Sequence, residues 1–232
     1  MKKILFFAVL TALITTLAAC GPKKVTKQFA KTNFATVTIE GSGKYGAINC
    51  LTGEELIPQE YANIGYYYSG YFTAQNASGI SLFDTLKNQI LPPQEQITAK
   101  DGYFEFSTAK TSKGDGSKGI FFIKTGKIVS GGCDALEVDK AGNAVMIATV
   151  VGQKVFGVFS PENEVILPLE YLYLVYDGEN YNAAKNKNEK NPIVDKNGKA
   201  NWALADATVF DKTGKQIKKL TKAQAKKIFE AQ

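Results

Sequence analysis

The chain has no histidine and no arginine, so lysine supplies all of its basic side chains. Without histidine there is no Ser-His-Asp or Cys-His catalytic arrangement, no imidazole ligand for zinc and no side chain that ordinarily titrates near neutral pH. Without arginine no guanidinium can hold a phosphate or a base edge through two hydrogen bonds. The composition therefore predicts no metal site, no cofactor and no specific nucleic-acid partner.

Cysteine is scarce as well, with three residues at positions 20, 50 and 133. Cys20 belongs to an N-terminal signal described below, and the remaining two thiols are too few for a metal site. In an oxidising compartment Cys50 and Cys133 can form a disulfide, but both can equally be small buried residues. The sequence leaves this pairing open.

The first 20 residues, MKKILFFAVLTALITTLAAC, place two lysines before an apolar stretch that is too short for a stable membrane span. The ending Leu-Ala-Ala-Cys resembles the lipobox of bacterial lipoproteins. That resemblance implies that residues 1–19 are removed and that Cys20 is acylated, which anchors the chain to a lipid bilayer. The alternative is an ordinary secretory signal that happens to end in cysteine.

Two distant segments share one pattern: KYGAINCLTGEELIPQEY at 44–61 and VFGVFSPENEVILPLEY at 155–171. Both contain aromatic-Gly, a short apolar stretch, a turn, an aliphatic pair, Pro, a variable residue and Glu-Tyr. Partial copies at 79–96 and 119–129 make the spacing roughly 35–40 residues, which is typical of repeat proteins. Asp-Lys-x-Gly turns begin at Asp139, Asp195 and Asp211, and such turns close antiparallel hairpins.

These patterns predict an all-β fold of tandem antiparallel hairpin or meander repeats in an open array, with a small closed β-propeller as the alternative. Prolines 58, 92 and 168 are expected at strand ends or sheet edges, because proline cannot donate to a ladder. The repeat resembles the WG repeat family, a β-repeat found in exported bacterial proteins, although Tyr45-Gly46 and Phe156-Gly157 replace its Trp-Gly. That resemblance implies a structural repeat and no catalytic residues.

The sequence divides into four parts: a signal at 1–19, a lipidated Cys20 with a tether at 20–35, a β-repeat domain at 36–220, and a helix at 221–232. Within the repeat domain, the polar stretch 177–191 is rich in Asn and Lys and is expected to be an exposed insertion. Thr221 and Gln224 form the pattern of a capping box, and the helix should cover the end of the last repeat.

The tyrosine-rich stretch GYYYSGYF at 65–72 is the main candidate for a binding surface. Tyr66, Tyr68 and Tyr71 can form an aromatic platform for sugar rings or a partner, since tyrosine combines a flat apolar ring with a polar tip. The alternative is that these rings pack between repeats.

The segment from Lys212 to Lys227 has seven lysines and no acid, so it is either an anion-binding patch or a solvated face.

Three further patterns are weaker as sites. GDGSKG at 114–119 is followed by a strand pattern, so it indicates a linker and not a nucleotide-binding loop. The Asp-Lys-x-Gly turns place lysine where a calcium loop needs further oxygen ligands. The acid pairs Glu54-Glu55 and Glu162 with Glu164 lie on turns, where solvated carboxylates are expected.

The sequence thus predicts a non-enzymatic lipoprotein of the bacterial cell envelope, held to the bilayer through acylated Cys20 and expected at the outer membrane. Its β-repeat array would be a scaffold or binding module for another envelope protein or a glycan. The competing hypothesis is an envelope hydrolase that uses paired carboxylates.

Overall fold

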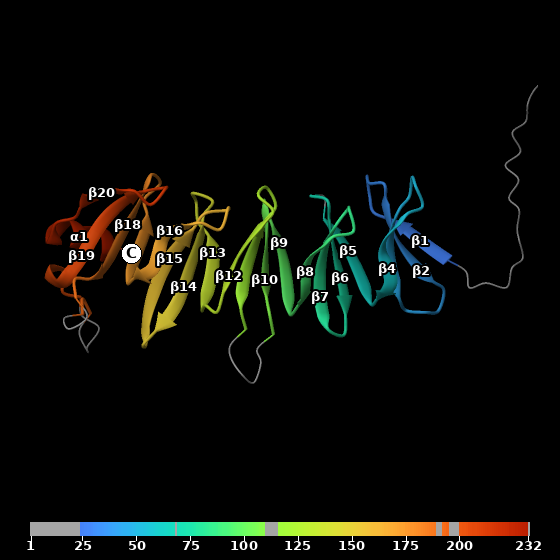
Figure 1. The fold of residues 1–232 in the computed structure, drawn as a ribbon, viewed down its shortest axis with the longest axis horizontal. Helices are drawn as coiled ribbons and strands as arrows, with labels where there is room; N and C mark the ends of the chain where they lie inside the picture. Colours follow the sequence, from blue (N-terminus) through green and yellow to red (C-terminus); the bar gives the residue numbers. More distant parts are fainter. Residues whose placement is uncertain (1–23, 68, 110–115, 189–191, 195–199, 232) are drawn as a thin grey trace, which may run out of the picture.

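The computed structural model describes residues 24–67, 69–109, 116–188, 192–194 and 200–231. These residues form an all-β fold with five four-stranded antiparallel sheets and one short α-helix. The sheets follow one another in a row that does not close on itself (Figure 1). The predicted open array of antiparallel meanders is therefore confirmed, and the closed propeller is wrong.

Each sheet is a meander of four consecutive strands. Sheet 1 contains β1 (Lys24–Gln28), β2 (Phe34–Ile39), β3 (Tyr45–Asn49) and β4 (Glu55–Tyr61). Sheet 2 contains β5 (Asn63–Tyr67), β6 (Tyr71–Asn76), β7 (Gly79–Asp84) and β8 (Gln89–Gln94). Sheet 3 contains β9 (Gln96–Lys100), β10 (Tyr103–Ser107), β11 (Lys118–Phe122) and β12 (Lys127–Gly131). Sheet 4 contains β13 (Ala135–Val138), β14 (Ala144–Val150), β15 (Gln153–Phe159) and β16 (Val165–Tyr171). Sheet 5 contains β17 (Tyr173–Tyr176), β18 (Asn180–Asn186), β19 (Ala205–Asp211) and β20 (Gln216–Lys219).

This regular order gives the row two distinct edges. Turns that follow the first and third strands of the sheets lie at the upper edge in Figure 1. Turns that follow second strands, such as 40–44, 77–78 and 151–152, lie at the lower edge with the connections between sheets. β1 runs toward an upper-edge turn, and its first residue, Lys24, pairs with Ile39 at the end of β2, so β1 begins on the side of the lower-edge turn 40–44.

Two sequence-based boundaries are wrong. The predicted tether at 20–35 contains β1, and β2 begins at Phe34, so the repeat domain starts by Lys24. The predicted exposed insertion at 177–191 contains β18, a central strand of sheet 5. Tyr181 and Ala183 on this strand are fully buried, and the Asn182 side chain donates to the Asp177 carboxylate at 2.9 Å, so its polarity is satisfied within the fold.

The aromatic-Gly element of the repeat marks a close approach of two strands. The register of β3 against β4 shifts at Gly46, and that of β15 against β16 shifts at Gly157. A Cβ at Gly46 would lie 2.5 Å from the Ile57 carbonyl oxygen, and a Cβ at Gly157 would lie 3.0 Å from the backbone of Leu169. A side chain at Gly46 would require the bulged partner strand to move, and one at Gly157 would make an unusually tight contact with it.

The Pro element of the repeat lies in the bulged strand. Pro58, Pro92 and Pro168 are exposed residues of β4, β8 and β16, each the fourth strand at the edge of its sheet. The predicted edge position of these prolines is confirmed. β12, the fourth strand of sheet 3, has no proline and pairs with β11 without a register shift. The sequence pattern therefore encodes a bulged edge strand.

The closing Tyr of the repeat joins one sheet to the next. Tyr61 at the end of β4 packs edge-on against Phe83 of sheet 2, with ring centroids 6.0 Å apart. Tyr171 at the end of β16 packs in the same way against Phe210 of sheet 5, at 5.8 Å. The core of the molecule consequently lies in layers between successive sheets.

A buried polar contact also connects sheets 4 and 5. The hydroxyl of Tyr181, which is fully buried, donates to Asp139 Oδ2 at 2.5 Å and accepts from the Asn143 side chain at 2.8 Å. Asp139 Oδ1 in turn accepts backbone N–H groups of its own turn. A turn of sheet 4 is thereby bonded to the second strand of sheet 5.

The last sheet is covered by α1 (Lys222–Phe229). Thr221 and Gln224 form the predicted capping box. Ala225 and Phe229 are buried, and Phe229 stacks at 5.3 Å on Trp202 of the 3₁₀ turn η1 (Trp202–Leu204). The helix thus removes from solvent the apolar face that no further sheet covers, as predicted.

Candidate functional site

A hollow of about 460 Å³ lies between sheets 4 and 5 at the lower edge of the row. One wall is the start of β15 and the other is β17, with Val194 beside them. The lining side chains are chiefly Gln153, Lys154, Phe156, Leu172, Tyr173 and Leu174. A hollow of this volume is large enough for a small molecule or for a few side chains of a partner.

The lining combines apolar walls with a polar rim. Phe156 and Leu172 are half-buried and form part of the walls, whereas Gln153 and Lys154 are exposed. Lys154 carries the charge of the lining. Such a site suits a ligand with an apolar or ring-shaped body and a polar or anionic end.

Tyr173 is held against the core of sheet 5 by two aromatic contacts. Its ring lies 4.8 Å from Trp202 and 5.6 Å from Phe229, which are part of the core beneath α1. Burial raises the pKa of Tyr173, and the nearby carboxylate of Glu230 raises it further. Its hydroxyl is therefore a protonated donor at neutral pH.

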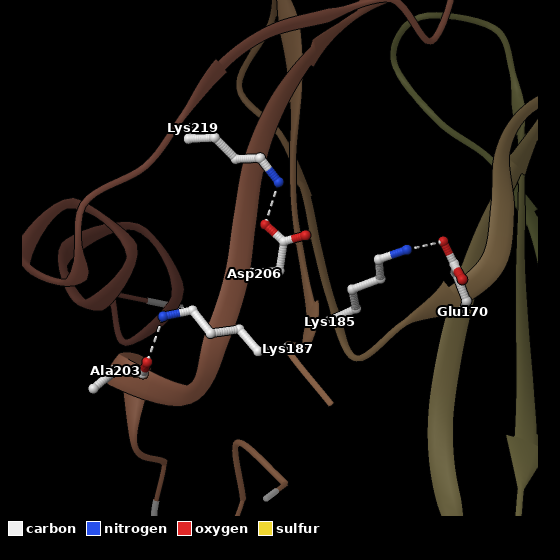
Figure 2. A network of polar contacts seen from close by, with 6 residues as sticks. All are labelled: Glu170, Lys185, Lys187, Ala203, Asp206 and Lys219. Carbon is white, nitrogen blue, oxygen red and sulfur yellow. Dashed lines mark hydrogen bonds and ion pairs between the residues drawn. The ribbon is translucent and has the colours of Figure 1, made fainter. Parts of the chain in front are cut away.

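Two ion pairs lie on strands of sheets 4 and 5 outside the lining of the hollow. Figure 2 shows Lys185 of β18 directed at Glu170 of β16, with Nζ 2.5 Å from Oε1. This hydrogen bond is the main cause of the raised pKa of Lys185. Lys219 of β20 contacts Asp206 of β19 in the same view. The first pair links the two sheets that form the hollow, and the second lies within sheet 5.

The structure does not bring the predicted tyrosine platform together. Tyr66 packs toward sheet 1, with its ring 5.4 Å from that of Phe34, whereas Tyr71 packs toward sheet 3, 5.5 Å from Phe104. The two residues are on opposite faces of sheet 2, and Tyr68 lies outside the described residues. A single platform that joins Tyr66 and Tyr71 is wrong, because these two rings pack in different layers of the core.

The two cysteines that the structure describes are free thiols. Cys50 is exposed in sheet 1 and Cys133 is half-buried between sheets 3 and 4, where burial raises its pKa. Stacked sheets stand about 10 Å apart, and a disulfide needs Cα atoms within about 7 Å. The candidate disulfide is therefore wrong, and Cys20 lies outside the described residues.

The lysine-rich segment gains acidic neighbours in the fold. Lys219 contacts Asp206, and Lys226 lies 3.9 Å from Glu230. Lys187 of the neighbouring connection donates to the Ala203 carbonyl oxygen at 2.7 Å (Figure 2). These pairs are exposed and each is worth about 0–1 kcal/mol, but they reduce the positive charge that the sequence suggests.

The other candidate motifs lie in turns and strands. Asp211 Oδ1 accepts backbone N–H groups of Thr213 and Lys215, as a turn residue does, and the corresponding turn at Asp195 lies outside the described residues. Gly119, the last residue of the GDGSKG motif, belongs to β11. Gly114 and Asp115 of that motif lie outside the described residues.

The predicted acid pairs are at the surface. Glu54 and Glu55 are exposed at the upper edge, and Glu54 lies 2.7 Å from Lys87 of the next sheet. Glu162 and Glu164 are exposed in the turn before β16. None of these four carboxylates lines the hollow between sheets 4 and 5.

Sequence reasoning missed the hollow itself. Its walls combine a β-hairpin with β17, and the apolar stretch YLYLVY at 171–176 predicts only that both faces of that strand are covered. The available signal was VVGQK at 150–154, where two valines precede a glycine turn.

Among the described residues, no helix is long and apolar enough to cross a bilayer.

Comparisons with known proteins add little to this geometry. No protein-family model and no curated protein matches the chain. Hsv2 of Kluyveromyces lactis is similar at 10% identity and a TM-score of 0.31, over 81% of this chain and 61% of that one. The tricorn protease is similar at 14% identity and a TM-score of 0.33, over 82% of this chain and 21% of that one.

A calcium-binding regucalcin of Agrobacterium tumefaciens is similar at 11% identity and a TM-score of 0.25, over 84% of this chain and 72% of that one. The chain therefore spans about three fifths of the length of Hsv2. TM-scores this low do not establish a shared fold, and these likenesses carry no argument about function.

Proposed function

We propose that the protein is a non-enzymatic lipoprotein of the bacterial cell envelope, anchored at the outer membrane through acylated Cys20. Its open row of sheets binds another envelope protein through the hollow between sheets 4 and 5. A glycan is the second ligand class that suits the same lining. The resemblance to WG repeats remains a prediction within this proposal.

The observation that carries the binding role is the composition of the hollow. Half-buried aliphatic and aromatic side chains form its walls, and exposed Gln153 and Lys154 stand at its rim. An apolar centre with a polar rim is the usual composition of a protein-binding patch. The same walls would also accept a sugar ring on Tyr173 or Phe156.

The anchor is tested by metabolic labelling with palmitate in the native host. We expect the wild type to carry the label and Cys20→Ser to lose it. A wild type that carries no label would overturn the lipoprotein proposal and leave an ordinary secreted protein. If the Cys20→Ser variant still carries labelled palmitate, the chain is acylated at another residue and the assignment of the anchor to Cys20 is wrong.

The binding site is tested by photo-crosslinking from within the native envelope. A photoreactive residue at Gln153 should yield one dominant protein adduct by mass spectrometry. The matched control replaces Glu162, which is equally exposed in sheet 4 but at the opposite edge. If the photoreactive residue at position 153 captures a glycan and no protein, the second ligand class is favoured. If positions 153 and 162 give equal amounts of the same protein adduct, the hollow is not a specific binding site.

A further inference from the structure

The turn between β14 and β15 presents bare apolar side chains at its tip. Val150 pairs with Gln153, so Val151 and Gly152 form a two-residue loop. Val151 is 98% exposed and Val150 is 50% exposed. Aliphatic side chains this exposed contribute little to the fold of the protein, and two adjacent ones form a small apolar patch at the tip of the hairpin.

The backbone of Val151 is also unfavourable. Its φ of 48° and the φ of 76° at Gly152 meet the requirement of a hairpin turn that favours Asn-Gly. A β-branched residue rarely adopts the left-handed region. The other non-glycine residues with positive φ in the described part of the chain are all polar, namely Lys31, Lys87 and Asn163. Within the described ranges, position 151 alone combines this strained backbone with an apolar side chain.

The hairpin protrudes beyond its neighbours. β13 pairs with β14 no further than Ile147, and β16 pairs with β15 no further than Phe156. Residues 148–155 therefore extend past both flanking strands. Figure 1 shows this tip below the ends of the adjacent strands, at the lower edge of the row.

The charge around the tip suits an anionic surface. Residues 140–161 include no acidic residue, and Lys154 is exposed four positions from Val150. A carboxylate on a neighbouring segment, that of Asp134, accepts a hydrogen bond from the Thr149 hydroxyl at 2.6 Å. The ammonium group of Lys118 bonds to the carbonyl oxygen of the same aspartate, which places a second lysine close by.

The described chain begins at the same edge. Lys24, the first residue of β1, pairs with Ile39 next to the lower-edge turn 40–44, and Cys20 is four residues before it. Four residues span at most about 14 Å. A lipid on Cys20 would therefore hold the lower edge of sheet 1 close to a bilayer, on the side to which the sheet 4 hairpin points.

We infer that the tip formed by Val150 and Val151 is a second, non-covalent contact with the bilayer. Lys154, at the rim of the adjoining hollow, then lies at the level of the anionic headgroups, and a partner in the hollow is bound at the membrane surface. Exposed apolar side chains beside a lysine are the combination that favours such an interface. The inference rests on the proposed anchor at Cys20. With both contacts made, the row of sheets lies along the membrane with its lower edge facing the lipid.

The test uses the lipidated full chain in phosphatidylglycerol vesicles, with and without bromine on the acyl chains. Tryptophan is introduced as Val151→Trp and, in a second variant, Val150→Trp. Leu51→Trp and Leu86→Trp are matched controls, because these leucines are 75% and 78% exposed in turns of the upper edge. Native Trp202 is buried and supplies a constant background. Circular dichroism confirms that each variant folds.

We expect brominated lipid to quench the fluorescence at positions 150 and 151 at least twofold, and to leave positions 51 and 86 unquenched. Flotation of the vesicles reports the anchor separately. If the chain floats but positions 150 and 151 are unquenched, or positions 51 and 86 are quenched instead, the inference is wrong and the anchor stands. If the lipidated chain does not float, the anchor fails and this inference fails with it.

Discussion

At the scale of single residues, the conformations in this protein follow local chemistry with one clear exception. Lys87 and Asn163 occupy left-handed turn positions where polar residues are tolerated, whereas Val151 occupies such a position with a bare aliphatic side chain. Neither packing nor hydrogen bonding within the fold explains that choice. A residue that costs stability in the free protein is expected where an outside contact uses it.

We predict that Val151→Asn stabilises the folded domain by about 1 kcal/mol, because asparagine tolerates the left-handed conformation better than valine. The measurement is urea unfolding followed by circular dichroism. The reverse exchange, Asn163→Val at φ 67°, should lower stability by a similar amount. Equal stabilities for wild type and Val151→Asn would show that the turn is not strained.

We also predict that Tyr181→Phe lowers the free energy of unfolding by about 1–3 kcal/mol, since it leaves buried Asn143 and half-buried Asp139 without their hydroxyl partner. Tyr176→Phe is the control, because its hydroxyl bonds only to an exposed carbonyl oxygen, and its cost should be below about 1 kcal/mol. Both are measured by urea unfolding.

The same variant has a pH signature. Burial and the Asp139 hydrogen bond raise the pKa of Tyr181 above its ordinary value of 10.0. The unfolded chain therefore loses the proton first, so this stabilisation is complete below pH 10 and declines as the pH rises above it. Tyr181→Phe should show a shallower loss of stability above pH 10, and an unchanged slope would contradict the assignment.

At the scale of elements, each part of the repeated sequence has a geometric role. Gly46 lets the bulged fourth strand approach, Pro58 lies in that strand at the sheet edge, and Tyr61 packs on the next sheet. The order of these residues is local, so the sequence predicts hairpins and edges well. It fails at β18, where asparagines alternate with buried Tyr181 and Ala183, because only the surrounding sheets make that polar strand stable.

We predict that Gly46→Ala costs about 1–3 kcal/mol, since the added Cβ would lie 2.5 Å from the Ile57 carbonyl oxygen and the bulge would have to open. Gly132→Ala is the matched control, because a Cβ there has no atom within 4 Å. Thermal unfolding of both variants tests the difference. A tolerated Gly46→Ala would mean that the aromatic-Gly pattern is not a packing requirement.

At the scale of the whole molecule, the row has layers of core between sheets, and among the residues that the structure describes no sheet-to-sheet pairing joins its two ends. Phe104 of sheet 3 is buried and packs on Tyr67 and Tyr71 of sheet 2. In such an array each unit depends on its immediate neighbours, so stability is a sum of unit and interface contributions. A weakened interior interface should therefore separate the row into two cooperative parts.

We predict that Phe104→Ala costs about 3–5 kcal/mol and splits urea unfolding into two steps. Hydrogen exchange with mass spectrometry should then show residues 24–94 and 116–231 losing protection at different urea concentrations. Phe229→Ala, which removes a buried ring at the end of the row, should destabilise without dividing it. A single transition for Phe104→Ala would indicate that the whole row unfolds as one unit.

The sequence by itself determined the antiparallel hairpins, their turns, the edge prolines and the terminal helix, because each depends on backbone preferences within a few neighbouring residues. It also predicts the signal and Cys20 from adjacent residues. The tertiary structure alone decided that the row stays open, that Tyr66 and Tyr71 face different layers, that Cys50 and Cys133 are far apart, and that a hollow lies between β15 and β17. These features depend on how strands that are far apart in the sequence stack in space, and no local sequence pattern encodes that stacking.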